Sequence, residues 1–284
     1  MKSNSASIFS DEYYRVLSIA GSDSGGGAGV QADIKTFAAL GCYGMTAITS
    51  ITSQNTVGIR SIHIVPVPIL GDQIDAVVED IGVDSVKIGM LASVDIVQAV
   101  SNAIDRHQLK NVVLDPVMVA TSGAVLIDHL AASALVHELF SRATIVTPNL
   151  DEASLLVGRL IQSETDMESA AEQLLCMGAR AILLKGGHMP GKQVCDLLLT
   201  TAGTRHWLRV PRMDTKNTHG TGCTLSAAIA ANLAMGVNLF SAVQSAHAYV
   251  RDAIKTGMTV RTGTGNGPLN HSHSPIPMRL NPLR

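Results

Sequence analysis

Aromatic and charged residues are both scarce in this chain. Only 3% of its 284 residues are aromatic and 15% are charged, while 46% are hydrophobic. A core must therefore be built mainly from Ala, Val, Ile and Leu, which suits a parallel sheet covered on both faces by helices. The net charge is −2 and basic runs are absent, so neither a nucleic acid nor an anionic membrane is expected as a partner.

Long apolar runs and paired cysteines are also missing. No segment approaches the roughly 18 apolar residues that span a bilayer, and the polar N-terminal segment lacks the apolar stretch of a signal peptide. The cysteines have no CxxC spacing and the chain is too long for a disulfide scaffold; they are Cys42, Cys176, Cys195 and Cys223. These absences predict a cytoplasmic protein with reduced thiols.

Short β-rich runs alternate with stretches of helical apolar spacing. The expected strands cover residues 15–20, 42–52, 61–65, 85–88, 112–115, 144–147 and 181–185. This alternation predicts an α/β fold with a central, mostly parallel sheet and helices on both faces. A hairpin of 194–200 with 205–210 is expected as a small β element at the sheet edge. We expect one domain over 1–284, with 1–14 and 272–284 disordered.

Three glycine-bearing segments compete for the role of phosphate site. Residues 21–29 formally contain a dinucleotide fingerprint, but no Asp or Glu occurs between Asp33 and Asp72 to hold a ribose. This segment is either a tight turn or a floor of backbone N–H groups for a small ligand. Residues 186–192 match a P-loop until Gln193, which lacks the hydroxyl that binds magnesium, so we reject a Walker site.

The third segment, 218–224, opens an expected helix. Backbone N–H groups at a helix N-terminus attract anions, and the glycines at 220 and 222 let a phosphoryl group approach closely. The same field favours the thiolate of Cys223. Alternatively, Thr218 or Thr221 caps the helix and Cys223 is a small core residue. The spacing alone leaves both interpretations open.

The ordered motifs resemble one family. They are GSDxxGGAGVQAD at 21–33, QNT at 54–56, KIGML at 87–91, LDPVM at 114–118, TPN at 147–149, LKGGH at 184–188 and KNTHGTGCT at 216–224. Together, over about 16–271, they resemble the hydroxymethylpyrimidine/phosphomethylpyrimidine kinases of the ribokinase-like superfamily. The resemblance implies a ribokinase-like fold that uses ATP and Mg²⁺ to phosphorylate 4-amino-5-hydroxymethyl-2-methylpyrimidine and then its monophosphate, in thiamine biosynthesis.

That resemblance also implies which residues meet the substrate. The pyrimidine should lie against Gly21, Asp33, Gln54, Met90 and Val117. An amide such as that of Gln54 can both donate to and accept from an aminopyrimidine. Judged without the family, Met90 and Val117 are core residues.

A second group of residues is expected around the phosphates. The resemblance implies that Lys185, Asn149 and Thr218 contact the nucleotide. It implies that Asp115 and Glu152 contact magnesium. Carboxylates and water suit magnesium, although Glu152 could instead be a solvated acid in the first turn of a helix. A lysine that ends a strand, as Lys185 does, is better explained by a phosphate than by unpaired burial.

The catalytic group is expected at the third glycine segment. It comprises Gly220, Thr221, Gly222 and Cys223. Cys223 stands where most ribokinase-like enzymes carry an aspartate base, and as a thiolate it could accept the proton of the substrate hydroxyl.

Two other functions remain open at this stage. A pyridoxal or pyridoxine kinase would share the fold, although dedicated pyridoxal kinases commonly have aspartate at the position of Cys223. A catalytically inactive nucleotide- or ligand-binding regulator is the alternative from another class, and the completeness of the expected site argues against it. Relatives are often dimers, so the resemblance also implies a homodimer.

Overall fold

The computed structural model describes residues 11–118 and 127–282. Its main sheet has eight strands in the order β11-β10-β9-β8-β7-β6-β2-β3. Their bounds are β2 Arg15–Ala20, β3 Tyr43–Ile48, β6 Ser85–Ile88, β7 Val112–Leu114, β8 Ile145–Val146, β9 Ala181–Leu184, β10 Gln193–Thr200 and β11 Arg205–Pro211. Six neighbouring strands run parallel to one another, namely β9, β8, β7, β6, β2 and β3. Strand β10 pairs antiparallel with both β9 and β11. The predicted parallel sheet and its edge hairpin are confirmed.

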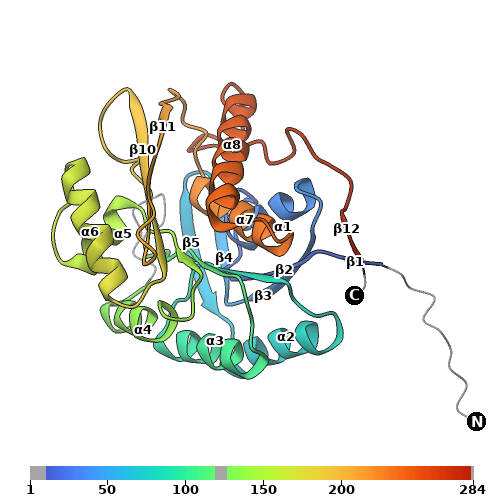
Figure 1. Ribbon diagram of the computed structural model, residues 1–284. Coiled ribbons are helices and arrows are strands. Elements are labelled where there is room, and N and C mark those ends of the chain that lie inside the picture. The colour runs from blue at the N-terminus through green and yellow to red at the C-terminus, as the bar shows by residue number, and fades with distance from the viewer. Residues whose placement is uncertain (1–10, 119–126, 283–284) are drawn as a thin grey trace, which may run out of the picture.

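Helices cover both faces of this sheet (Figure 1). Those of one face are α2 Val67–Asp80, α3 Val94–His107, α4 His129–Leu139, α5 Leu150–Val157 and α6 Glu164–Cys176, and those of the other are α1 Gly29–Ala39, α7 Thr221–Ala234 and α8 Leu239–Gly257. Successive strand residues alternate between the two cores, as Leu17 and Val16 do. The strands are therefore apolar on both faces, as a doubly covered parallel sheet requires.

Helix α7 lies inside the molecule rather than on its surface. All its residues from Thr224 to Ala234 are buried, and many of them are alanines. The small side chains let the helix pack between the sheet and α8, which Figure 1 shows beside it. This burial fixes the N-terminus of α7 at the sheet edge where the parallel strands end.

A separate antiparallel hairpin leaves the main sheet. Its strands are β4 (Ser50–Asn55) and β5 (Gly58–Ile64). The single strand predicted over 42–52 is therefore wrong, because the chain divides at Thr49. There the Thr49 backbone N–H donates to Ala20 and its hydroxyl donates to the carbonyl of Met90. These bonds turn the chain away from the sheet.

The ends of the described chain pair with each other. Asp11–Tyr13 (β1) lies antiparallel to Leu280–Pro282 (β12). The backbone N–H of Arg279 also donates to Gly41 after α1. The disorder expected for 1–14 and 272–284 is therefore wrong at residues 11–14 and 272–282, because these polar segments find partners distant in sequence. The rest of those two segments lies outside the described residues. Among the residues described, no helix is long and apolar enough to cross a membrane.

Candidate active site

A cavity of about 1060 Å³ lies at the carboxyl ends of the parallel strands. Gly21 follows β2, Asp115 follows β7, Asn149 follows β8 and Lys185 follows β9, and all four line the cavity. Because the carboxyl ends of parallel strands share one edge, residues far apart in sequence meet there. The structure thus brings together nearly all of the side chains that the sequence singled out.

One end of the cavity collects four of the residues expected to bind the pyrimidine. They are Gly21, Gln54, Met90 and Val117. Gln54 reaches this end from β4, and its side-chain oxygen accepts a hydrogen bond of 3.3 Å from the hydroxyl of Thr52. Gly21 is needed here because an added Cβ would lie 2.6 Å from the hydroxyl oxygen of Ser50. This end therefore combines a small floor, an apolar wall and one amide.

Asp33 is the exception. It is not among the residues that line the cavity, and its side chain is fully buried. Oδ2 accepts hydrogen bonds from Ser18 at 2.6 Å and from Lys87 at 2.8 Å, and within the described residues Oδ1 has no hydrogen-bond partner. Asp33 therefore lies behind the cavity wall and pairs with a buried lysine through one oxygen, and its contact with the pyrimidine stays a prediction.

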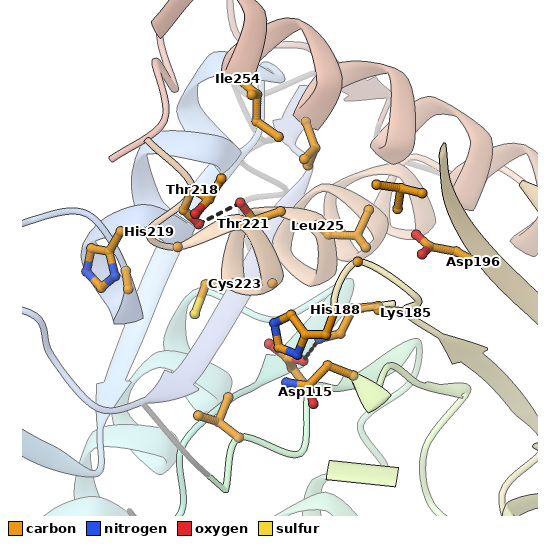
Figure 2. Close-up of a pocket in the computed structure, with 18 of the residues that line it drawn as sticks. Asp115, Lys185, His188, Asp196, Thr218, His219, Thr221, Cys223, Leu225 and Ile254 are labelled. Atoms are coloured by element: carbon orange, nitrogen blue, oxygen red, sulfur yellow. Dashed lines mark hydrogen bonds and ion pairs between the residues drawn. The ribbon is translucent and has the colours of Figure 1, made fainter. Parts of the chain in front are cut away.

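The anion pocket forms at the start of α7, as the glycine spacing predicts. Gly220 precedes the helix with φ of +85°, and its own Cβ would clash with Gly27, so only glycine fits. The hydroxyl of Thr221 donates to the carbonyl of Thr218 at 2.7 Å. Figure 2 shows these two residues with Cys223 nearby on the same helix. The N–H of Thr221 donates to Thr218 at 3.2 Å, and the N–H groups of Gly222 and Cys223 that follow have no partner within the helix and can bind an anion.

Cys223 lines the cavity, and its thiol is in a mixed environment. Burial raises its pKa to about 11, and the nearby carboxylates of Asp33 and Asp115 add to the rise, whereas Lys87 opposes it. Burial thus opposes the thiolate that the helix N-terminus is expected to favour. The role of Cys223 as a base stays a prediction.

The ion pair of Lys185 with Asp115 lies beside the pocket. Nζ of Lys185 donates to Oδ1 of Asp115 at 2.8 Å, and the hydroxyl of Thr147 donates to the same oxygen at 3.1 Å. Burial raises the pKa of Asp115, but the two lysines, Lys185 and Lys87, lower it more, so it is ionised. A Cβ on Gly222 would lie 3.2 Å from Nζ of Lys185. The lysine charge therefore adjoins the anion pocket.

Asn149 and Glu152 form a capping box at the start of α5. The N–H of Glu152 donates to Asn149, and the N–H of Asn149 donates to the Glu152 carboxylate. Glu152 is only 3% exposed and lines the cavity, so the alternative of a solvated acid is wrong. Burial raises its pKa to about 7, and Lys185 opposes the rise. One carboxylate thus caps a helix and faces the phosphate region.

Three close side-chain pairs at the site were not predicted. They are Lys87 with Asp33, His219 with Asp23 at 2.8 Å, and His247 with Asp196 at 2.6 Å. The available signals were a lysine inside the apolar strand β6 and an aspartate inside the apolar strand β10. Buried charges of this kind need partners. The His247 pair lies near the apolar end of the cavity, where Leu225 and Ile254 appear in Figure 2.

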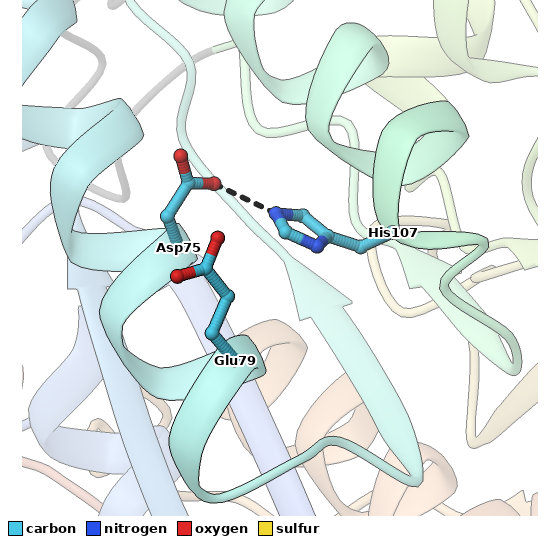
Figure 3. A group of neighbouring side chains, drawn as sticks. All are labelled: Asp75, Glu79 and His107. Carbon is cyan, nitrogen blue, oxygen red and sulfur yellow. Dashed lines mark hydrogen bonds and ion pairs between the residues drawn. The ribbon is translucent and has the colours of Figure 1, made fainter.

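A separate cluster of possible metal ligands lies on the surface, away from the cavity lining. It consists of Asp75 and Glu79 on α2 and His107 at the end of α3 (Figure 3). Asp75 already pairs with His107 at 2.7 Å and with the guanidinium of Arg106. A cation would have to displace Arg106, so we assign no metal to this cluster.

Known proteins were compared with the chain as a whole. A family model described as phosphomethylpyrimidine kinase matches residues 23–270. The hydroxymethylpyrimidine/phosphomethylpyrimidine kinase of Rhizobium meliloti is 49% identical, covering 90% of this chain and 96% of that protein. The Escherichia coli protein of the same name is 44% identical, covering 91% and 97%.

Solved structures give the same result for the fold. An ADP complex of Bacillus subtilis pyridoxal kinase is 37% identical with a TM-score of 0.83, covering 92% of this chain and 98% of that one. The phosphomethylpyrimidine kinase of Clostridium difficile is 39% identical with a TM-score of 0.75, covering 84% and 99%. The family match and the identities over nine tenths of the chain lead to one conclusion: this chain belongs to the phosphomethylpyrimidine kinase family.

Proposed function

We propose that the protein transfers the γ-phosphoryl group of ATP to the hydroxymethyl group of 4-amino-5-hydroxymethyl-2-methylpyrimidine, and then a second phosphoryl group to the monophosphate. The observation that carries this proposal is the position of the anion pocket. On one side a Cβ on Gly222 would lie 3.2 Å from Nζ of Lys185 and 3.6 Å from Oδ2 of Asp115, and on the other Gly220 contacts Gly27 of the loop that begins at Gly21. A phosphoryl group held there would face an acceptor on one side and charged groups on the other.

The residues of each half would have distinct tasks. Gln54 would pair with the aminopyrimidine, while Gly21, Met90 and Val117 would hold its ring. The N–H groups of Gly220 and Gly222 would bind the moving phosphoryl group, and Thr221, whose N–H donates to Thr218, would hold the turn between them. Thr218, Asn149 and Lys185 line the cavity on the nucleotide side.

The nucleotide is supported by the neighbours and by the cavity. Among similar structures, the Bacillus subtilis pyridoxal kinase binds ADP and the Staphylococcus aureus one binds AMP-PCP. Here the apolar residues Leu225, Val250 and Ile254 line a part of the cavity that suits an adenine ring. We infer that ATP spans from these side chains to the start of α7.

Magnesium fits the acids beside the pocket. Asp115 and Glu152 both line the cavity, and hard carboxylate oxygens together with phosphate oxygens suit Mg²⁺. When bound, the ion would neutralise part of the phosphate charge. Cys223, as a thiolate, would take the proton of the acceptor hydroxyl; its raised pKa means that forming this thiolate costs free energy in the unliganded chain.

A homodimer is supported by the hairpin of β4 and β5. Its exposed faces carry four large aliphatic side chains, which are Ile51, Val57, Ile62 and Ile64. Apolar side chains gathered on one hairpin favour burial against a partner. We propose that a second copy of the chain covers them in a cytoplasmic enzyme, and sedimentation at varied concentration tests the dimer.

Product analysis tests the reaction itself. Purified protein with ATP and magnesium is given the pyrimidine, pyridoxal or no acceptor, and the products are separated by ion-exchange chromatography. We expect the pyrimidine monophosphate first and the pyrophosphate later. Consumption of ATP only with pyridoxal would instead support the second candidate, a pyridoxal kinase, which the similarity to the Bacillus subtilis structure favours. ATP consumption with neither acceptor would contradict the proposal.

A further inference from the structure

The two loops that build the acceptor and phosphate halves of the site are joined by one buried side-chain contact. Asp23 lies in the glycine loop after β2, and His219 lies 196 positions later, just before the anion pocket. Nε2 of His219 donates to Oδ2 of Asp23 at 2.8 Å. Asp23 is 1% exposed and His219 8% exposed. Water therefore does not compete effectively for this bond.

Asp23 organises the glycine loop around its carboxylate. Oδ1 accepts the N–H of Gly25 at 2.8 Å, and Oδ2 accepts the N–H groups of Gly27 at 3.1 Å and Ala28 at 2.9 Å. Burial raises the pKa of Asp23, but the bonds from His219 and the loop amides outweigh it, so the net shift is downward. An ionised carboxylate with four donors is a strong anchor for the loop.

The backbone of His219 is also held in place. Its backbone N–H donates to the carbonyl of Gly267 at 3.1 Å. A Cβ on Gly27 would lie 2.5 Å from Cδ2 of His219, and a Cβ on Gly220 would lie 1.8 Å from the carbonyl oxygen of Gly27. The two loops therefore contact each other without spare room. A shift of one loop must move the other.

The imidazole lies apart from Lys185 and Asp115 in Figure 2, although His219 lines the same cavity. Its Nε2 is bound to Asp23, so this nitrogen is not free to bind a nucleotide phosphate.

We infer that His219 is a positioning residue. Through Asp23 it holds the glycine loop of residues 21–29, the acceptor loop, at a fixed position relative to the anion pocket. The inference rests on the proposed transfer and adds what aligns its two reactants. The distance between the acceptor loop at Gly21 and the anion pocket at Gly220 then stays the same when either ligand is absent. Misplacing one reactant by about 1 Å can cost roughly 10²-fold in rate.

The test compares three substitutions of one residue. His219→Gln keeps an N–H donor that can reach Asp23, His219→Leu keeps bulk without a donor, and His219→Asn keeps polarity but is too short. We expect His219→Leu and His219→Asn to lower kcat for the pyrimidine by roughly 10²-fold, and His219→Gln to regain most of it. Binding of AMP-PCP should not change. His137→Leu, an exposed histidine on α4, is the control for a histidine replacement elsewhere.

A second readout separates positioning from general damage. Hydrolysis of ATP without an acceptor uses the pocket but not the acceptor loop, so it should be equal in all three variants. Asp23→Asn combined with His219→Leu should cost no more than the worse single change, because both remove the same bond. A folded His219→Leu protein with parental kcat would overturn the inference. Equal loss of acceptor-free hydrolysis and of pyrimidine transfer would also overturn it.

Hydrogen exchange tests the contact without any substrate. Amides of residues 21–29 should exchange faster in His219→Leu and His219→Asn than in His219→Gln, and equal rates would contradict the inference. The proposed function is tested separately by the turnover of the parent protein with the pyrimidine. If the parent does not phosphorylate the pyrimidine, the proposed function fails and the exchange data alone decide the role of His219.

Discussion

Nζ of Lys87 lies 2.8 Å from Oδ2 of Asp33, and neither side chain is exposed. The pair lies beneath the acceptor end of the cavity, and Lys87 itself lines the cavity. The nearby carboxylates raise the pKa of Lys87 despite its burial, so it is charged. Its charge favours the thiolate of Cys223, and that of Asp33 opposes it. The structure thus places a fixed positive charge near the thiol that was expected to act as the base.

Breaking this pair should destabilise the protein. Lys87→Met leaves the Asp33 carboxylate buried without a cation, which costs about 3–5 kcal/mol of unfolding free energy. Lys87→Met combined with Asp33→Asn removes both charges and should recover much of that loss. Urea unfolding at pH 7 measures all three proteins. An unfolding free energy for Lys87→Met equal to that of the parent would show that water reaches the carboxylate.

The reactivity of Cys223 should follow its raised pKa. With a pKa of about 11, alkylation of the free enzyme by iodoacetamide should be slow at pH 7 and should rise about tenfold per pH unit up to pH 10. Asp33→Asn should speed it, because that carboxylate raises the thiol pKa. Mass spectrometry assigns the modified cysteine, and the exposed Cys176 serves as the internal comparison. A rate that levels off near pH 8 would contradict the effect of burial.

The role of Cys223 as a base is tested by turnover. Cys223→Ser replaces the thiol with a hydroxyl that is much harder to deprotonate and should lower kcat by roughly 10²–10⁴ with little change in ligand binding. The first transfer, to an alcohol, should lose more than the second, to a phosphate monoester. Cys223→Asp should partly restore the first transfer. Near-parental turnover of the Ser variant on both acceptors would leave Cys223 as a residue that only shapes the helix end.

Lys185→Ala should separate phosphate chemistry from pyrimidine binding. The change removes the charge beside the anion pocket and leaves Asp115 without its 2.8 Å partner. We expect turnover to fall by roughly 10²-fold or more, while the dissociation constant for the pyrimidine stays unchanged. Steady-state kinetics and calorimetry measure the two quantities. Parental turnover would make Lys185 a structural residue.

Gln54→Leu should weaken pyrimidine binding and leave ATP binding intact. Polar atoms of the pyrimidine would lose their amide partner, which costs about 1–3 kcal/mol of binding free energy. ATP binding should remain as in the parent, because Gln54 lies at the acceptor end. Calorimetry with each ligand decides, and equal loss of both would indicate misfolding. Thr52→Val is a comparison variant that leaves the Gln54 amide in place, since it removes a hydroxyl that lies 3.3 Å from Gln54 and donates to the carbonyl of Ser22 at 2.7 Å.

His271 makes stability depend on pH. Burial, with smaller contributions from Lys35 and His219, lowers its pKa from 6.5 to about 4, and its Nε2 lies 3.1 Å from the hydroxyl of Thr224. Between these values the unfolded chain binds the proton and the folded chain does not, so stability falls as pH drops through this window. The contribution of His271 to this loss from pH 7 to pH 5 should be about 2 kcal/mol. The raised pKa of Glu152 acts with the opposite sign in the same window, so the test is the difference between the parent and His271→Gln in urea unfolding at the two pH values.

The sheet was predictable because its strands are local and apolar. Runs such as 85–88 and 181–184 are apolar apart from Ser85 and Lys87, and helices of regular spacing separate them. Asp115 and Lys185 followed from their positions at strand ends, whereas the pyrimidine-binding residues were implied by the family resemblance. The capping role of Glu152 was also within reach, since Asn followed three residues later by Glu is a known start signal for a helix.

Other features depend on distant partners and could not be predicted from local patterns. The pairing of Asp33 with Lys87 joins positions 54 apart, and that of Asp23 with His219 joins positions 196 apart. The state of Cys223 depends on a competition between the helix field and burial, and only the packed structure gives the burial. The final residues looked disordered because their composition is polar, while their hydrogen bonds go to the chain's other end.

The antiparallel contact of β1 with β12 makes the described backbone almost a closed ring. Asp11 lies opposite Pro282, so a short peptide could join the two ends without disturbing the main sheet. New ends could then be opened at Ala202 and Gly203, the exposed turn between β10 and β11. Such a circular permutant would keep every strand neighbour. In this fold the order of elements in space does not depend on where the chain starts.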